Sequence, residues 1–351
     1  MKLPKLTDLK IKGKRILLRL DLDVALEDGK VAEDYRLKAA IPTIDYLLEQ
    51  GSGRIVVLGH RGRPGGKVVE SLSLEPVAKH LEKLMRDYLG REKFKNLEMY
   101  MMENLRFDAG ESLDTARDKE EMMEYAAYLA EHGDIYVNDA FGVCHRETAS
   151  VVGLPKLLPH AAGKRLTEEV EHLEKVLPSI GGSASGGEFP KRPVVMIIGG
   201  GKYDKVVFVD KLFRHADTVL VGGVLPHKIK SYCRDTDGKM CIVAAHVNRS
   251  GRDITPDSAR NFAEVIKTAK TIVWNGPMGD IDNNRWEGTE IVAKAVVNSK
   301  AYKIAGGGDT IHALHKLGIS DKIDFISTGG GAMLEYLAYG DLPGLLALRN
   351  R

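Results

Sequence analysis

Short apolar runs alternate with amphipathic segments along the whole chain. In the first half, four runs predict buried strands and three segments with apolar residues at helical spacing predict helices. The expected strands cover residues 16–20, 54–58, 97–102 and 134–138, and the expected helices cover 35–49, 74–89 and 119–131. The apolar runs of the second half cover 193–198, 218–221, 241–245, 271–274, 303–306 and 325–327. This alternation of strand and helix predicts an α/β fold with parallel sheets.

The chain length points to two such domains. The chain has 351 residues and 43% hydrophobic content, enough for two ordinary cores. An amphipathic, charged segment over 166–177 precedes a glycine- and serine-rich run over 181–187, which we interpret as a surface loop. We therefore place the domain junction just before or within that segment, between residues 163 and 164. The expected architecture is two doubly wound parallel-sheet domains that face each other across a cleft.

Composition excludes several classes of protein. The formal net charge is +2 with no long basic run, which argues against a nucleic-acid partner. No apolar stretch reaches 18 residues, and the N-terminus lacks the apolar core of a signal peptide. The three cysteines form neither a disulfide framework nor a zinc pattern, so we expect a cytoplasmic, reducing location. Cys144 lies beside His145, and we expect it to be a packed side chain rather than a nucleophile.

The stretch from Lys303 to Thr310 joins a predicted strand to a predicted helix through three glycines. Glycines let a ligand approach the backbone, and the N–H groups of a helix start attract anions. A phosphate with a metal held by Asp309 is one interpretation. The other is a tight strand-to-helix turn in which Asp309 or Thr310 only caps the helix. Gly318 lies where the end of this helix is expected.

The two halves differ in the residues that follow their strands. In parallel α/β sheets, ligands bind beyond the carboxyl ends of the strands. In the first half these positions, with a helix start, carry Arg19, Asp21, Arg36, His60, Arg63, Arg106, His145 and Arg146, whereas in the second half they carry mainly glycines. Several arginines in one place favour a small polyanion, and bare backbone suits a nucleotide. A small acid together with a nucleotide suggests phosphoryl transfer.

Two common nucleotide motifs are missing. No lysine has the context of a P-loop, and the glycines at 306–308 do not complete the Gly-x-Gly-x-x-Gly dinucleotide pattern. A dehydrogenase is therefore disfavoured.

Six motifs in order resemble phosphoglycerate kinase, a family of bilobal, usually monomeric glycolytic enzymes. They are Gly59-His-Arg-Gly-Arg-Pro64, Glu103-Asn-Leu-Arg-Phe107, Val137-Asn-Asp-Ala-Phe-Gly142, Trp274-Asn-Gly-Pro-Met-Gly279, Gly306-Gly-Gly-Asp-Thr310 and Ser327-Thr-Gly-Gly-Gly-Ala332. The resemblance runs from Leu18 to about Leu348. It implies reversible phosphoryl transfer between 1,3-bisphosphoglycerate and ADP with Mg²⁺, giving 3-phosphoglycerate and ATP.

The resemblance also implies roles for individual residues. The phosphoglycerate would be held by Arg19, Asp21, Asp23, Arg36, His60, Arg63, Arg106 and Arg146. Arg36, Lys202 and Lys205 would be catalytic, with Lys202 at the transferring group and Lys205 on the nucleotide phosphates, and Asp309 would hold the metal. The nucleotide would contact Gly200, Gly201, Lys202, Lys205, Gly222, Gly223, Asn275, Pro277, Asp282, Gly307, Gly308, Asp309 and Thr310. Residues 1–163 would bind phosphoglycerate and 164–335 the nucleotide, and a tail over 336–351 would return to the first domain.

The chain departs from the family pattern at several positions. Asp23 replaces a substrate-binding asparagine, and an anion there repels the substrate unless an arginine pairs with it. Thr148 replaces a histidine, and Lys202 and Lys205 are three residues apart rather than four. Segments after Leu89 and between 223 and 271 look shortened. These departures leave two hypotheses, an active phosphoglycerate kinase or a catalytically weak relative that acts as a ligand-binding or interaction protein.

Overall fold

The computed structural model describes residues 2–112, 114–177, 190–234, 240–281 and 286–350. These residues form two compact units. Residues 1–170 and 341–351 belong to the first unit, and residues 171–340 belong to the second. The expected surface loop over 181–187 lies outside the described residues. In the part of the chain that is described, no helix is both long and apolar enough to cross a bilayer.

The first unit is built on a parallel five-stranded sheet with the order β5-β4-β1-β6-β7. Its strands are β1 (Arg15–Arg19), β4 (Arg54–Leu58), β5 (Met99–Met101), β6 (Ile135–Asn138) and β7 (His160–Ala162). Its α-helices are α1 (Tyr35–Glu49), α2 (Glu75–Phe94), α3 (Lys119–Ala130), α4 (Leu154–Leu157), α5 (Lys164–Glu174), which runs on into the second unit, and α11 (Pro343–Arg349). A small antiparallel pair, β2 (Leu26–Glu27) and β3 (Lys30–Val31), and a π-helix over Ala149–Gly153 complete these elements. Short 3-10 turns cover Leu6–Asp8, Glu70–Leu72, Leu105–Phe107, Ala109–Glu111 and Phe141–Val143.

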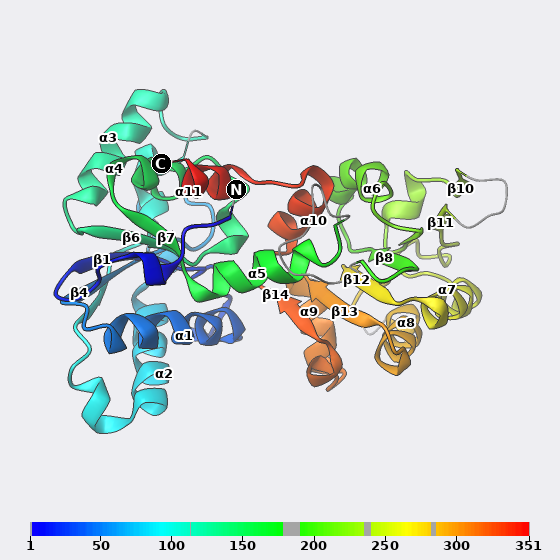
Figure 1. Cartoon of the computed structure of the whole chain (residues 1–351). Helices are drawn as coiled ribbons and strands as arrows, with labels where there is room; N and C mark the ends of the chain where they lie inside the picture. Colours follow the sequence, from blue (N-terminus) through cyan, green and yellow to red (C-terminus); the bar gives the residue numbers. More distant parts are fainter. Residues whose placement is uncertain (1, 113, 178–189, 235–239, 282–285, 351) are drawn as a thin grey trace. The chain divides into compact units, whose positions relative to one another are not determined.

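Helices cover both faces of this sheet (Figure 1). Successive strand residues point to opposite faces. Ile16, Leu18 and Ile55 pack with the apolar faces of α1 and α2 in one core. A second cluster, which includes Met122, Ala126 and Val151, lies among α3 and the π-helix, against which α4 and α11 also pack. The sheet is therefore doubly wound, as the sequence predicts.

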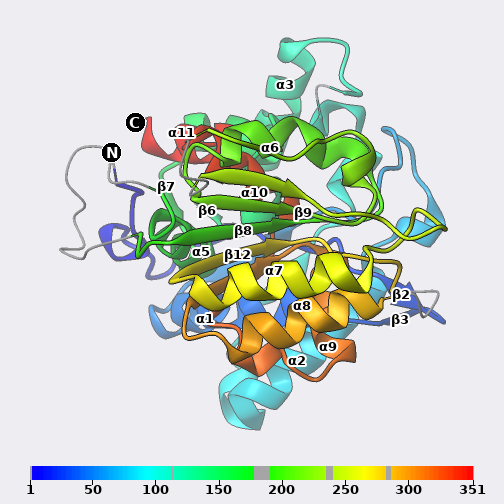
Figure 2. The same cartoon turned by 90° about the vertical axis from the view of Figure 1, so that its right-hand side faces the viewer.

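The second unit holds a seven-stranded sheet with the order β10-β11-β9-β8-β12-β13-β14, parallel except for β10. Its strands are β8 (Val194–Ile198), β9 (Thr218–Val221), β10 (Tyr232–Cys233), β11 (Cys241–Ala244), β12 (Thr271–Asn275), β13 (Tyr302–Gly306) and β14 (Phe325–Ser327). Its α-helices are α6 (Val206–Leu212), α7 (Pro256–Thr268), α8 (Glu287–Asn298), α9 (Gly308–Lys316) and α10 (Gly330–Tyr339). Short 3-10 turns cover Tyr203–Lys205, Leu225–His227 and Ser320–Lys322. Figure 2 shows α7 and α8 side by side over one face and α6 over the other.

The glycine-rich turn between β13 and α9 forms where the sequence predicts it. β13 ends at Gly306 and α9 begins at Gly308, and Gly318 follows the end of the helix with a φ of +65°. The expectation that Asp309 or Thr310 caps the helix is wrong, because Gly307 occupies the cap position and no side chain bonds there. Asp309 instead lies exposed in the first turn. The Asp309 carboxylate therefore makes no capping hydrogen bond to the start of α9.

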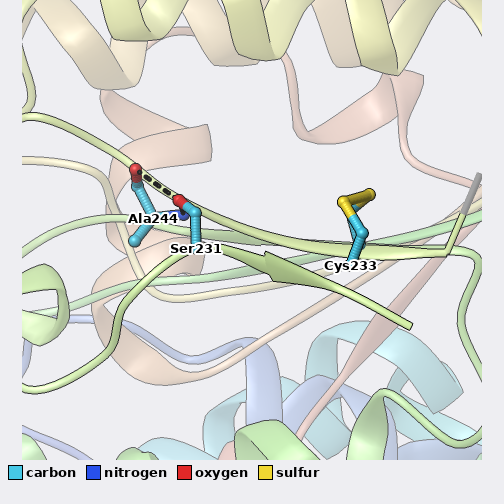
Figure 3. The surroundings of a disulfide bond; sticks show 4 residues. Ser231, Cys233 and Ala244 are labelled. Carbon is cyan, nitrogen blue, oxygen red and sulfur yellow. Dashed lines mark hydrogen bonds between the residues drawn. A yellow bond between two sulfur atoms is a disulfide. The ribbon is translucent and has the colours of Figure 1, made fainter. Parts of the chain in front are cut away.

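Two cysteines are paired, which corrects the expectation drawn from the cysteine count. β10 and β11 pair antiparallel with Cys233 directly opposite Cys241, and their sulfurs form a disulfide (Figure 3). Ser231 Oγ donates a hydrogen bond to the Ala244 carbonyl at 3.4 Å (Figure 3) and accepts one from the Ala244 amide at 2.9 Å. Strand pairing creates this proximity, and the cysteine spacing alone does not show it. The cysteines therefore no longer support a reducing compartment. Cys144 is buried as expected, and burial raises the pKa of its thiol, so it is no nucleophile.

Candidate functional site

The arginines predicted to hold an acid converge in the first unit. Arg19 ends β1, His60 follows β4, Arg36 lies in the first turn of α1, and Arg106 and Arg146 lie in turns that follow β5 and β6. Burial, then the positive charges of Arg19 and Arg106, hold the pKa of His60 well below its ordinary value of 6.5. The charges of Arg36 and Arg146 act in the same direction. Four arginines from four segments therefore act electrostatically on one imidazole, and one of them, Arg19, contacts it.

The same cluster extends to His145 and Arg63. Burial lowers the pKa of His145 to about 4, and the charges of Arg146, Arg106 and Arg63 add to the effect. Burial also lowers the pKa of Arg106 to about 10, with neighbouring arginines second. Such a concentration of like charge is unfavourable for the ligand-free protein and is relieved by an anion. The first unit therefore carries a concentration of positive charge that a bound anion would relieve.

The two aspartates at this edge have structural partners. Asp21 Oδ2 accepts a hydrogen bond from the Gly142 amide at 2.9 Å. Asp23 Oδ1 accepts one from the Gly62 amide, also at 2.9 Å, and the Asp23 carbonyl accepts from Arg36. Asp23 also acts on Arg106, whose pKa its charge raises. Its carboxylate thus holds the loop after β4 and is partly balanced by an arginine.

Asp139, within the Val137–Gly142 motif, is buried at the start of α5. Its Oδ1 accepts from the Leu166 amide at 3.0 Å, Thr43 also contacts it, and its Oδ2 has no partner. Burial raises the pKa of this carboxyl from 3.8 to about 6, and Arg165 opposes the shift. The folded protein therefore keeps a proton on Asp139 up to about pH 6, whereas the unfolded chain releases it near pH 4.

Removing this titration should change how stability depends on pH. Because the folded state binds more protons between about pH 4 and pH 6, the wild type loses stability as pH rises through that window. Asp139→Asn has no titrating group at this position and should not lose stability in this way. The free energy of unfolding of the variant, relative to that of the wild type, should therefore increase by up to about 3 kcal/mol between pH 4 and pH 7. Denaturant unfolding followed by circular dichroism at several pH values measures this difference. A difference that stays constant over pH would show that the pKa of Asp139 does not change on folding.

The predicted nucleotide residues meet at the carboxyl ends of β8, β9, β12 and β13. Backbone bonds join Gly199 to Asn275, Gly200 to Pro277 and Gly223 to Met278, at 2.8–3.1 Å. Asn275 donates from Nδ2 to the Gly330 carbonyl, and Thr310 Oγ1 accepts from the Gly276 amide at 2.6 Å. Because Asn275 and Thr310 are buried, they build the loops rather than line a surface. Gly201, Lys202, Gly308 and Asp309 are the exposed members of the predicted set. Asp282 lies outside the described residues.

The two lysines differ in their surroundings. Lys202 is exposed just beyond β8. Lys205 is half-buried, and its Nζ donates to the Gly199 carbonyl at 2.9 Å and lies 3.5 Å from the Asn275 carbonyl. Burial lowers the pKa of Lys205 from 10.5 to about 8, against the charge of Asp309. This places Lys205 and Asp309 within electrostatic reach of each other.

Asp309 fits a magnesium ion that is shared with a nucleotide. Among the described residues, no three His, Cys, Asp or Glu side chains are grouped to hold a metal. Magnesium, however, commonly takes one or two carboxylates and completes its shell with phosphates and water. An exposed carboxylate at a helix start meets that need.

Comparisons with known proteins identify the family. The sequence profile described as Phosphoglycerate kinase matches residues 6–233 and 227–339. The chain belongs to the phosphoglycerate kinase family. It is 37% identical to the phosphoglycerate kinase of Moorella thermoacetica over 406 aligned positions that cover 99% of both chains. Because the alignment is longer than this 351-residue chain, the relative carries insertions relative to it.

Solved structures of this family have the same fold. The phosphoglycerate kinase of Pyrococcus horikoshii OT3 matches with a TM-score of 0.79 and 29% identity over 98% of both chains. The enzyme of Coxiella burnetii matches with a TM-score of 0.75 and 29% identity over 100% of both chains. The predictions of the family and of the α/β fold are thus confirmed. The roles of the individual site residues stay predictions.

Proposed function

We propose that this protein is an active phosphoglycerate kinase that moves a phosphoryl group reversibly between 1,3-bisphosphoglycerate and ADP. The proposal rests mainly on the four arginines of the first unit whose positive charges act on His60. Guanidinium groups match phosphate and carboxylate oxygens, and 3-phosphoglycerate has one of each at its two ends. The sheet does not need such a cluster of positive charge in order to fold, so the cluster points to a ligand.

Different residues bind the acid, bind the nucleotide and act on the transferring phosphoryl group. Arg36, Arg63, Arg106 and Arg146 bind the acid, with His60 as a further donor. Lys205 and the amides at the start of α9 bind the nucleotide phosphates, because ammonium and N–H groups both attract anions. Lys202 acts on the transferring group, where charge spreads onto the oxygens during transfer. Asp309 would hold a magnesium ion, which would neutralise charge on the nucleotide phosphates. A cytoplasmic monomer is part of this proposal and rests on the family alone.

A coupled assay with 1,3-bisphosphoglycerate and ADP tests the activity. Turnover that requires Mg²⁺ supports the proposal. The alternative, a ligand-binding relative with weak catalysis, is supported by calorimetric binding of 3-phosphoglycerate and ADP without turnover.

Arg63→Ala should weaken 3-phosphoglycerate binding by about 1.5–3 kcal/mol, the contribution of a hydrogen bond to a charged group. Arg63 is exposed, and its charge reaches His145 inside the cluster. ADP binding should be unchanged, because ADP is assigned to the other unit. Calorimetric titration with each ligand measures both affinities.

Arg54→Ala is the matched control. Arg54 starts β4, at the opposite end of the strand that leads to Arg63, and pairs with Glu98 on the surface. Its removal should change neither affinity. Loss of ADP affinity in Arg63→Ala, with 3-phosphoglycerate binding intact, would contradict the assignment of the two ligands.

A further inference from the structure

Arg19 is enclosed by the protein. It is 1% exposed, although it was expected to hold the acid directly. Its Nε–H donates to Ser150 Oγ at 3.0 Å, one terminal nitrogen donates to the Leu20 carbonyl, and the other contacts His60 Nδ1 at 2.8 Å. A guanidinium donates and never accepts, so the direction of each of these bonds is fixed.

The bond from Arg19 determines the protonation of His60. Since Nδ1 accepts from Arg19, this nitrogen carries no proton, and the imidazole N–H must be on Nε2. A second proton on the ring is opposed by burial and by the surrounding arginines, which lower its pKa well below 6.5. His60 is therefore a neutral donor inside a positive cluster. It can donate to an anion without adding to the repulsion among the arginines.

A buried carboxylate holds Arg19 through a serine. Glu111, 1% exposed, accepts from Ser150 Oγ at 2.6 Å and from the Ser150 amide at 3.1 Å. Because Ser150 Oγ accepts from Arg19, its own O–H is free to point at Glu111. The charge of Arg19 opposes the rise that burial causes in the pKa of Glu111. Thr148, at the position of the missing histidine, is buried beside Ser150 and contacts Glu111 as well.

Burying two charges is costly, and a buried ion pair is weak support for stability on its own. These two lie at the edge of the sheet where the acid is proposed to bind. We propose that Glu111, Ser150 and Arg19 form a positioning relay that keeps His60 neutral with its proton on Nε2, as a hydrogen-bond donor to the acid ligand. Glu111, Ser150 and Arg19 are then positioning residues, and Arg19 acts on the ligand through His60. The ligand part of this inference rests on the proposed function, but the state of His60 does not.

Nitrogen-15 NMR of the histidine side chains tests the relay without any ligand. In the wild type between pH 6 and pH 8, His60 should show an unprotonated Nδ1 and a protonated Nε2. Ser150→Ala removes the acceptor of Arg19 Nε–H, and Arg19→Met removes the donor to Nδ1. Each should give a mixture of tautomers or move the proton to Nδ1. If Arg19→Met does not fold, Ser150→Ala still decides the question.

Thr43→Val is the control for loss of a buried hydroxyl. Thr43 is fully buried in the same unit and accepts from the Lys164 amide, away from His60. It should leave the His60 tautomer as in the wild type. A His60 that keeps a pure Nε2–H tautomer in Ser150→Ala would overturn the relay, whether or not Arg19→Met folds.

A double-mutant cycle tests the step to the ligand. His60→Ala should weaken 3-phosphoglycerate binding by at least about tenfold, since it removes the donor to a charged group. Arg19→Met should weaken binding by no more than this, in proportion to the loss of the proton from Nε2. The double variant should lose no more than His60→Ala alone, because the two residues act as one unit. Additive losses would show that Arg19 contacts the ligand itself and would overturn the relay's role in binding. A wild type that binds no 3-phosphoglycerate would refute the proposed function, while the NMR result would still decide the relay.

Discussion

Lys202→Ala should lower kcat by roughly 100- to 1,000-fold, with little change in either KM. Lys202 is exposed beyond the end of β8. Its ammonium is therefore available to the oxygens of a phosphoryl group in transfer, which gain charge only in the transition state. Steady-state kinetics in both directions measures the effect.

The kinetics of Lys205→Ala must be compared with those of Lys202→Ala to assign the two roles. Lys205 is held on the Gly199 carbonyl, so we expect it to contribute to nucleotide binding and its loss to raise the KM for ADP. If Lys205→Ala abolishes kcat while Lys202→Ala stays near normal, the two roles are exchanged.

The pH dependence of ADP binding distinguishes the lysines independently of kcat. The pKa of Lys205 is lowered to about 8, so in the ligand-free protein its positive charge is lost as pH rises above that value. ADP affinity of the wild type should fall from pH 7 to pH 9 by up to about tenfold, because binding must then take up a proton. This decrease should be absent in Lys205→Ala and present in Lys202→Ala.

Regular elements were predictable because their apolar patterns are local. The predicted helix over 35–49 and the predicted strands over 54–58 and 218–221 coincide with α1, β4 and β9. The strands that the sequence missed include β7 and β10. β7 has three residues and follows Pro159, and both residues of β10 are exposed, so neither shows a buried apolar run.

The site was predictable only in part, because motifs show which residues are present and not which of them are enclosed. Arg19 and Arg63 look alike in the sequence, yet one is buried with three bonds and the other is exposed. Glu111 and Ser150 were missed altogether. They are 39 residues apart, and only the fold brings the carboxylate to the hydroxyl. The only sequence signal for Glu111 is its position four residues after the motif that ends at Phe107.

Gly276→Ala should destabilise the second unit by about 2–6 kcal/mol and weaken ADP binding. Gly276 has a φ of +99°, a conformation in which a side chain is strained by about 1–3 kcal/mol. A Cβ there would lie 2.0 Å from the Gly199 carbonyl oxygen and 2.6 Å from Lys205 Nζ. Overpacking of this kind typically costs about 1–3 kcal/mol more. Relief requires the loops after β8 and β12 to separate, which removes the acceptor that holds Lys205.

Two other glycines separate the causes of this loss. Gly318 has a φ of +65° with open space around a Cβ, and Gly201 has open space without a positive φ. Gly318→Ala should therefore show only the backbone strain, about 1 kcal/mol, and Gly201→Ala should unfold like the wild type within about 0.5 kcal/mol.

Both tryptophans of the chain, Trp274 and Trp286, belong to the second unit, so their fluorescence during denaturant unfolding reports on that unit alone. If Gly276→Ala is no less stable than Gly318→Ala, the loops after β8 and β12 can separate without cost, and the close approach at Gly276 does not hold Lys205 in place.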